Sequence, residues 1–185
     1  MKFFFFLALA ALSLTASGQG LQPDFSSGEF KASAGYVHEF SGMNGIGASL
    51  SYQLPLNEWF QLEAGIRRVE ASGHPRTDMV QEFTRATALE GSALFSPIHT
   101  ESQSLRIGLG YSFADYDIRR ATPVVGASKE IQYQTADAGG LSRGIIVHAE
   151  YEWNINERFS AGARVGYYKA YTYVVMAGPF IGIHL

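Results

Sequence analysis

Apolar side chains alternate with small, polar or charged ones along short stretches of this chain. In the clearest stretch the apolar positions are Leu105, Ile107, Leu109, Tyr111 and Phe113. The residues between them are Arg106, Gly108, Gly110, Ser112 and Ala114. A period of two places successive side chains on opposite faces of a β-strand. The pattern therefore predicts strands with one apolar, aromatic face and one small or polar face.

Eight such stretches occur, joined by links of two kinds. The predicted strands cover residues 29–40, 46–54, 60–67, 83–95, 105–114, 145–153, 159–167 and 173–185. Most links are short, and residues 56–60 resemble residues 155–159, which predicts that one tight-turn solution is used twice. Residues 71–81 and 117–140 are long and polar and are the predicted loops. Similar strands joined by such links predict an antiparallel, up-and-down all-β domain.

The N-terminus has the order of a secretory signal peptide. Lys2 precedes an apolar run over residues 3–14, and the small residues 16–18 follow. This order predicts a signal peptide over residues 1–18 and a mature domain over residues 19–185. A membrane anchor is the alternative, but the run is shorter than the roughly 20 residues that a spanning helix needs. The chain contains no cysteine, which excludes an acylated lipoprotein.

Composition narrows the class of partner. The chain has 185 residues, enough for one domain, and a formal net charge of -3 with no basic tract. We therefore expect no nucleic-acid partner. No stretch of the mature part is apolar for long enough to form a transmembrane helix, so a membrane location requires strands.

The two strand faces indicate which medium each one meets. The polar face is rich in glycine and serine and carries charges. Those charged or titratable residues are Lys31, Glu39, Glu63, Arg67, Glu90, Arg106, His148, Glu150, Glu152 and Arg164. The side chains on this face are too small and too rich in charge for the exterior of a soluble protein, but they suit the narrow interior of a small barrel. The pattern predicts an eight-stranded transmembrane β-barrel with its apolar face in lipid. A soluble periplasmic barrel that binds a hydrophobic ligand is the alternative.

Aromatic residues gather at both ends of the predicted strands. The group beside the short turns contains Trp59, Phe60, Phe95, Trp153 and Phe159. The group at the other ends contains Tyr36, Tyr111, Phe113, Tyr167, Tyr171 and Tyr173. Two aromatic groups match the two interfacial girdles of a membrane barrel.

The signal peptide, the turns and a last strand that runs to the C-terminus resemble the small eight-stranded outer-membrane barrels of the OmpX and OmpA transmembrane-domain type. The chain is also similar to the short outer-membrane β-barrel proteins of Bacteroidota. The resemblance implies a monomer in the cell outer membrane, with contacts to outer-membrane lipid and lipopolysaccharide and to the barrel-assembly machinery. It implies no cofactor. Family members usually end in Phe or Trp, whereas this chain ends in Leu185, and Pro179 is unusual inside a strand.

The inward charges are the candidate site. Eight strands leave an interior that side chains fill, so we expect a packed polar core and no diffusion pore. The predicted structural network consists of Glu63, Arg67, Glu90, Arg106, His148, Glu150 and Arg164. A proton or ion path, and hence a narrow passive porin, is the alternative role of these residues. The histidines have no metal-ligand spacing, and we expect no metal and no catalytic residue.

Two functional alternatives depend on the loops. Some outer-membrane barrels deacylate lipid A with His, Ser and Glu, and here His38 precedes Ser41 and Asn44. That spacing does not match the enzyme motif, so we expect a rim histidine and a protein that is not an enzyme. The expected role is structural, or surface interaction through residues 71–81 and 117–140. Within the second loop, residues 129–135 alternate weakly, which indicates either an extended hairpin edge that pairs with a partner or a solvated loop.

Overall fold

The computed structural model describes residues 27–73, 81–125 and 131–185. The predicted signal peptide lies outside the described residues, as do the middles of both predicted loops. The strands are β1 (Glu29–Glu39), β2 (Asn44–Pro55), β3 (Phe60–Ser72), β4 (Phe83–His99), β5 (Gln103–Val125), β6 (Ile131–Asn154), β7 (Phe159–Lys169) and β8 (Tyr173–His184). No helix in the described ranges is long and apolar enough to cross a membrane.

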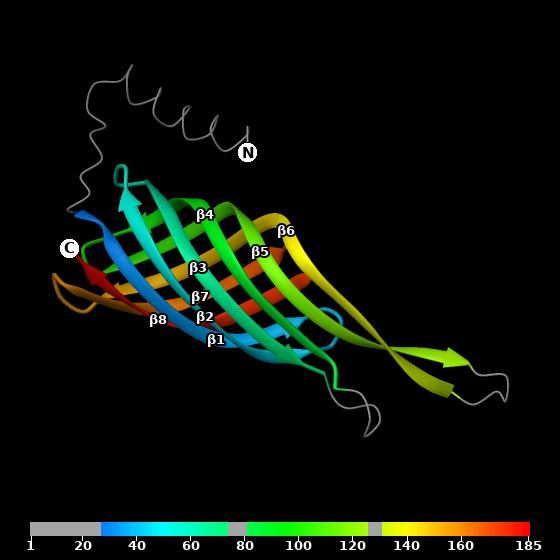
Figure 1. Cartoon of the computed structure of the whole chain (residues 1–185). Coiled ribbons are helices and arrows are strands. Elements are labelled where there is room, and N and C mark those ends of the chain that lie inside the picture. Colours follow the sequence, from blue (N-terminus) through cyan, green and yellow to red (C-terminus); the bar gives the residue numbers. More distant parts are fainter. Residues whose placement is uncertain (1–26, 74–80, 126–130) are drawn as a thin grey trace, which may run out of the picture.

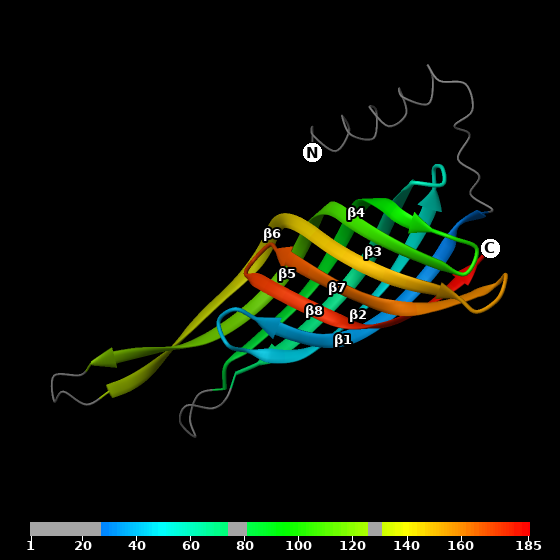
Figure 2. The ribbon, with the colours of Figure 1, turned by 180° about the vertical axis from the view of Figure 1, so that it is seen from behind.

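The eight strands form a closed barrel in sequence order (Figure 1). Each strand is antiparallel to its neighbours, and β1 pairs with β8 to close the ring. The view from behind shows the same continuous wall (Figure 2). We call the end that holds the C-terminus and the β2–β3, β4–β5 and β6–β7 turns the turn end, and the opposite end the hairpin end. The predicted up-and-down, eight-stranded architecture is confirmed.

The apolar strand face lies outside the barrel. Ile107 and Leu109 keep 49% and 64% of their surface exposed, whereas Arg106 on the same strand is 4% exposed. A bilayer stabilises this arrangement because lipid surrounds the apolar face and a closed sheet leaves no unpaired edge in hydrocarbon. The alternative of a soluble barrel with an apolar ligand cavity is therefore wrong.

Two short turns use the same hydrogen bonds, as their similar sequences predict. Asn57 Oδ1 accepts hydrogen bonds from the backbone N–H groups of Trp59 and Phe60, both at 2.8 Å. Asn156 Oδ1 accepts them from Arg158 at 2.8 Å and from Phe159 at 2.9 Å. An asparagine side chain that satisfies the backbone two and three residues later fixes a tight turn.

Residues 117–125 and 131–140 lie in β5 and β6, the two paired strands of a hairpin, so the prediction of a loop over these residues is wrong. The β5–β6 ladder continues from Gln103↔Trp153 to Val125↔Ile131 without a register shift. Beyond the barrel both faces of this ribbon meet solvent, so its sequence lacks the apolar alternation that marks the other strands. β3 also continues to Ser72, within the predicted first loop, and β4 continues to His99 through a register shift between Phe95 and Ile98.

Candidate functional site: the lumen network and the projecting hairpin

One charged network fills the lumen toward the turn end. Its centre is Glu150, whose carboxylate accepts hydrogen bonds from Lys31 Nζ at 2.8 Å, Arg106 Nη1 at 3.0 Å and Arg164 Nε at 2.9 Å. These cations come from β1, β5 and β7, so the network ties together strands that are not all neighbours. Glu150 is buried, and three cations around it compensate the cost of removing its charge from water.

Further carboxylates surround the same cations. Arg106 donates to both oxygens of Glu152, at 2.7 and 2.9 Å. Arg164 donates to both oxygens of Glu63, at 3.0 and 2.6 Å. Lys31 also pairs with Glu152 and lies 3.3 Å from a carboxylate oxygen of Glu29. Bidentate arginine–carboxylate pairs are directional, so they fix the side chains as well as balance their charges.

The structure places all seven predicted network residues on the lumen side. Glu63, Arg106, Glu150 and Arg164 are brought together, and His148 Nε2 lies 4.0 Å from Glu63 Oε1. Arg67 and Glu90 form a separate pair at 2.6 Å. The predicted set omitted four residues that belong to the central network: Glu29, Lys31, Gln53 and Glu152.

Gln53 shows why some of these were missed. Its Nε2 donates to Glu63 at 2.6 Å and to Glu150 at 3.0 Å, although the sequence marks it as a neutral residue near a strand end. The period-two pattern did assign Lys31 and Glu152 to the inward face. It carries no information on which residues meet across the lumen, because that depends on the stagger of the closed barrel.

An aromatic and apolar layer covers the network toward the hairpin end. The Arg67 guanidinium carbon lies 3.2 Å from the centre of the Tyr168 ring, within the range of a cation–π contact. Tyr168 belongs to a buried apolar cluster, whose members are Val37, Met43, Val69, Ala71, Ile146, Tyr168, Val174 and Met176. The expectation of a wholly polar core is therefore wrong in this half, where apolar residues occupy the inward positions of the strands.

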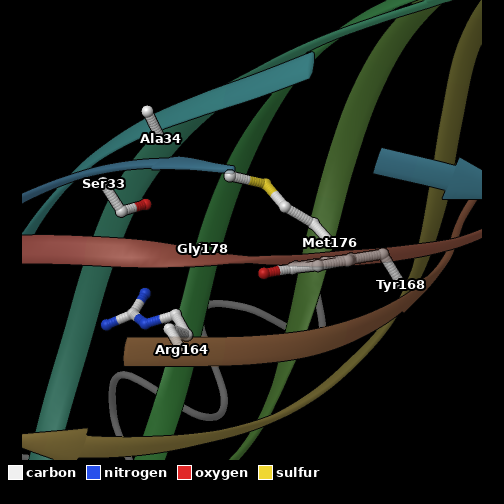
Figure 3. A pocket seen from close by; sticks show the side chains of 6 residues that line it. All are labelled: Ser33, Ala34, Arg164, Tyr168, Met176 and Gly178. Carbon is white, nitrogen blue, oxygen red and sulfur yellow. The ribbon is translucent and has the colours of Figure 1, made fainter. Parts of the chain in front are cut away.

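A small cavity lies between the charged layer and the apolar layer. Its volume is about 10 Å³, and its lining is Ser33, Ala34, Arg164, Tyr168, Met176 and Gly178 (Figure 3). This volume suits one water molecule. Side chains fill the neighbouring parts of the described lumen, which favours a structural role for the charges over a diffusion path.

The hairpin-end mouth of the lumen is held by a second polar group. Glu39 is fully buried, accepts a hydrogen bond from Thr84 Oγ1 at 2.8 Å and pairs with Arg120. Arg120 Nη1 also donates to Ser41 Oγ at 2.5 Å. The pair therefore joins the base of the projecting hairpin to the β1–β2 turn.

Tyr171 lies at the same mouth, in the link between β7 and β8, and not in the outer aromatic girdle where the sequence pattern placed it. It packs against the apolar cluster and stacks on Tyr116 with the ring centroids 5.3 Å apart. Burial raises the pKa of Tyr171 to about 12. The girdle prediction fails here because residues of a link do not follow the alternation of a strand.

The candidate catalytic residues of the enzyme alternative have other partners. His38 Nδ1 and Asn44 Oδ1 lie 2.8 Å apart, and the Tyr36 hydroxyl donates to the same oxygen at 2.5 Å. Ser41 instead accepts the hydrogen bond from Arg120. The geometry therefore does not build a His–Ser nucleophile pair.

Two groups of potential metal ligands occur in the described lumen: Glu29, Glu152 and His184, and Glu63, His148 and Glu150. In the second group the Arg164 guanidinium contacts both carboxylates, at 2.6 and 2.5 Å. A resident side-chain cation thus balances the charge that a metal ion would balance.

The β5–β6 hairpin projects past the rest of the barrel (Figure 1). β4 pairs with β5 only as far as Arg119, and β7 pairs with β6 only from Ile145 onward. On the outer ribbon Arg119 donates to the two carboxylate oxygens of Asp137, at 2.8 and 3.1 Å, and these hydrogen bonds lower the pKa of Asp137. Within the described ranges, both outer edges of the ribbon carry no third strand.

No protein-family model and no curated protein sequence matches this chain. Solved structures do share its fold. Neisserial surface protein A (NspA) superposes with a TM-score of 0.57 at 12% identity, over 85% of this chain and 96% of that one. A major outer membrane protein from Thermus thermophilus gives 0.55 at 10% identity, over 86% and 100%. Ail, the attachment invasion locus protein of Yersinia pestis, gives 0.50 at 16% identity, over 85% and 98%.

These similarities confirm the predicted fold, an eight-stranded antiparallel barrel like those of these outer-membrane proteins. The apolar outer surface and this shared fold together support the predicted location in the outer membrane. Identities of this size show the fold alone, so the role of the chain has to be argued from its own residues.

Proposed function

We propose that this chain is a non-enzymatic outer-membrane protein whose lumen is structural and whose β5–β6 hairpin binds a partner at the cell surface. The observation that carries the proposal is the length of the β5–β6 ladder, which continues past the last residues paired with β4 and β7. With the turn end toward the periplasm, this ribbon stands outside the cell. A ribbon with free edges presents backbone donors and acceptors that an extended segment of another protein pairs with.

The β6 edge has little of the usual protection against such pairing, and Asp137 and Arg143 are the only charged side chains of residues 133–144. Exposed edges in natural sheets are blocked by proline, lysine or bulges. Residues 133–144 contain no proline and no lysine, and their ladder to β5 has no register shift. Leu141 on this segment is 87% exposed, which gives an extended partner an apolar contact beside the backbone.

The proposal is tested with a shortened hairpin. A variant that joins Arg120 to Ala136 through an Asn-Gly turn removes residues 121–135 and keeps the Arg120–Glu39 pair, and Leu141→Lys in the same variant blocks the edge that remains. A displayed library of random peptides is selected on the mature barrel in lipid nanodiscs. We expect enriched peptides with strand-like alternation that bind the complete protein and lose at least tenfold in affinity for the variant. Peptides that bind both proteins equally, or no enrichment, would contradict the proposal.

Contact with anionic lipid is proposed for the outer surface near the hairpin end. Arg143 and Lys169 are exposed there, and no carboxylate of the described chain lies within ion-pair distance of either. The Lys169 Nζ lies 5.3 Å from the centroid of Tyr173, which also packs against Phe40 and Tyr167. Cations beside an aromatic girdle suit phosphorylated headgroups such as those of lipopolysaccharide.

The lipid contact is tested by native mass spectrometry of the monomer with lipopolysaccharide. Lys169→Gln, which removes one charge beside the Tyr173 ring, should reduce the bound fraction several-fold. Arg158→Gln, a neutralised cation in a turn at the opposite end, is the matched control and should leave binding unchanged. Equal loss in both variants would show that the effect is one of total charge and not of this surface.

A further inference from the structure

The seam that closes the barrel is interrupted in the middle. Pairing of β1 with β8 runs from Glu29↔His184 to Ser33↔Phe180 and resumes at Tyr36↔Ala177. The skipped residues are Ala34 and Gly35 on β1 and Gly178 and Pro179 on β8. Proline has no N–H to donate, so a ladder hydrogen bond is lost there.

The interruption is confined to one side of β8. Pairing with β7 continues through Ala163↔Pro179 and Arg164↔Gly178. The two seam backbones also stay close, because a Cβ placed on Gly178 would lie 2.0 Å from the Ala34 carbonyl oxygen. The two strands therefore stay side by side, but the Ala34 carbonyl lacks the N–H donor that Pro179 cannot supply. Lipid at this depth supplies no donor in its place.

The one-water cavity lies directly against this gap. Ala34 and Gly178, which flank the missing hydrogen bond, are part of its lining, together with Ser33 and Arg164 (Figure 3). Tyr168 reaches the same cavity from β7. A Cβ on Gly166 would lie 2.4 Å from the Tyr168 hydroxyl oxygen, so the glycine makes room for this ring.

The Tyr168 hydroxyl is a second polar group at this cavity (Figure 3). Tyr168 is 5% exposed, it packs in the apolar cluster, and Arg67 lies over its ring. Buried hydroxyls of tyrosine normally have a hydrogen-bond partner. A carbonyl without its ladder donor and a buried tyrosine hydroxyl therefore border a space of one-water size.

We propose that one ordered water occupies this cavity as a built-in part of the wall. The water donates to the Ala34 carbonyl in place of the N–H that Pro179 lacks, and it hydrogen-bonds the Tyr168 hydroxyl. Arg164 and Ser33 supply the remaining polar surroundings that a buried water requires. This water joins the seam to the charged lumen network where the β1–β8 ladder is interrupted.

The test uses amide exchange and water contacts of the ¹⁵N-labelled mature barrel in lipid nanodiscs. We expect a water–amide nuclear Overhauser effect at Gly35 or Gly178 that disappears in Tyr168→Phe, which keeps the ring and removes the hydroxyl. We also expect the amides of Ala34 and Ala177, whose N–H groups face the seam, to exchange at least tenfold faster than that of Ile181, which lies in the paired part of the seam.

Pro179→Ala restores a donor and should slow the seam amides at least tenfold. Pro97→Ala is the matched control, since Pro97 lies within the β4–β5 register shift near the turn end, away from the cavity. Heat-modified gel mobility verifies that each variant is folded. Absence of the water signal in the wild-type protein, its persistence in Tyr168→Phe, or unchanged exchange in Pro179→Ala would each overturn the proposal.

Discussion

Arg106 shows at the scale of one residue how much the lumen depends on complete charge pairing. Its guanidinium contacts Glu150 and both oxygens of Glu152, and all three side chains are buried. Replacing Arg106 by Met should lower the free energy of unfolding by about 3–5 kcal/mol, because carboxylate charge then stays buried without its partner. The measurement is the urea midpoint followed by heat-modified gel mobility.

Arg119→Met is the matched control for this prediction. Arg119 also pairs with a carboxylate, that of Asp137, but on the exposed ribbon. Water screens that pair, so its loss should leave the urea midpoint unchanged. Equal midpoints for Arg106→Met and the wild-type protein would show that the lumen charges are not buried in the folded barrel.

The Arg119–Asp137 pair has its own pH dependence. Hydrogen bonding from Arg119 lowers the pKa of Asp137 below its ordinary value of 3.8. A lowered folded pKa means that the pair stabilises the ribbon above pH 3.8 and loses this effect as the pH falls through the folded pKa. The Arg119 Nε–H chemical shift should therefore titrate with a midpoint below 3.8 and stay flat in Asp137→Asn. A midpoint at or above that ordinary value would contradict the pair.

The projecting hairpin is an element that the barrel does not need. Beyond Arg119 no β4 residue pairs with β5, and before Ile145 no β7 residue pairs with β6. The variant that joins Arg120 to Ala136 should therefore keep the unfolding temperature of the complete protein. Replacing Arg120 by Met in the full-length chain should lower that temperature, because the buried Glu39 then loses its cation. A large loss of stability in the shortened variant would show that the ribbon is part of the folding unit.

The bounds of the strands could be predicted from the sequence in some places and not in others. Period-two alternation located the barrel part of β5, because one face there meets lipid and the other meets the lumen. The same rule failed over residues 134–140, which are exposed on both faces of the ribbon and have the composition of a loop. Gly140 also makes the segment resemble a loop in sequence, although it lies within β6 with a φ of 140°. The backbone ladder, not side-chain patterning, holds this part of the element.

The lumen of the whole molecule could be predicted in content but not in arrangement. The alternation of side chains along each strand assigned Glu150 and Arg164 to the inward face from the sequence alone. Contact between Lys31 and Glu150 depends on the way the ring of strands closes, since β1 and β6 are far apart in strand order. The apolar layer around Met176 was missed because alternation assigns residues to the inside without separating a polar layer from an apolar one along the barrel axis.

The orientation of the whole barrel in lipid leads to the last prediction. Leu109 lies outward on the part of β5 paired with both neighbours, so Leu109→Arg should place a charge in hydrocarbon and cost about 2–4 kcal/mol near the bilayer midplane. Leu141 is more exposed than Leu109, but it lies on the ribbon beyond the β7 pairing. Leu141→Arg should therefore leave stability unchanged. The measurement is reversible urea unfolding in phospholipid vesicles, and equal costs for the two variants would contradict a bilayer around the barrel wall that ends below the hairpin.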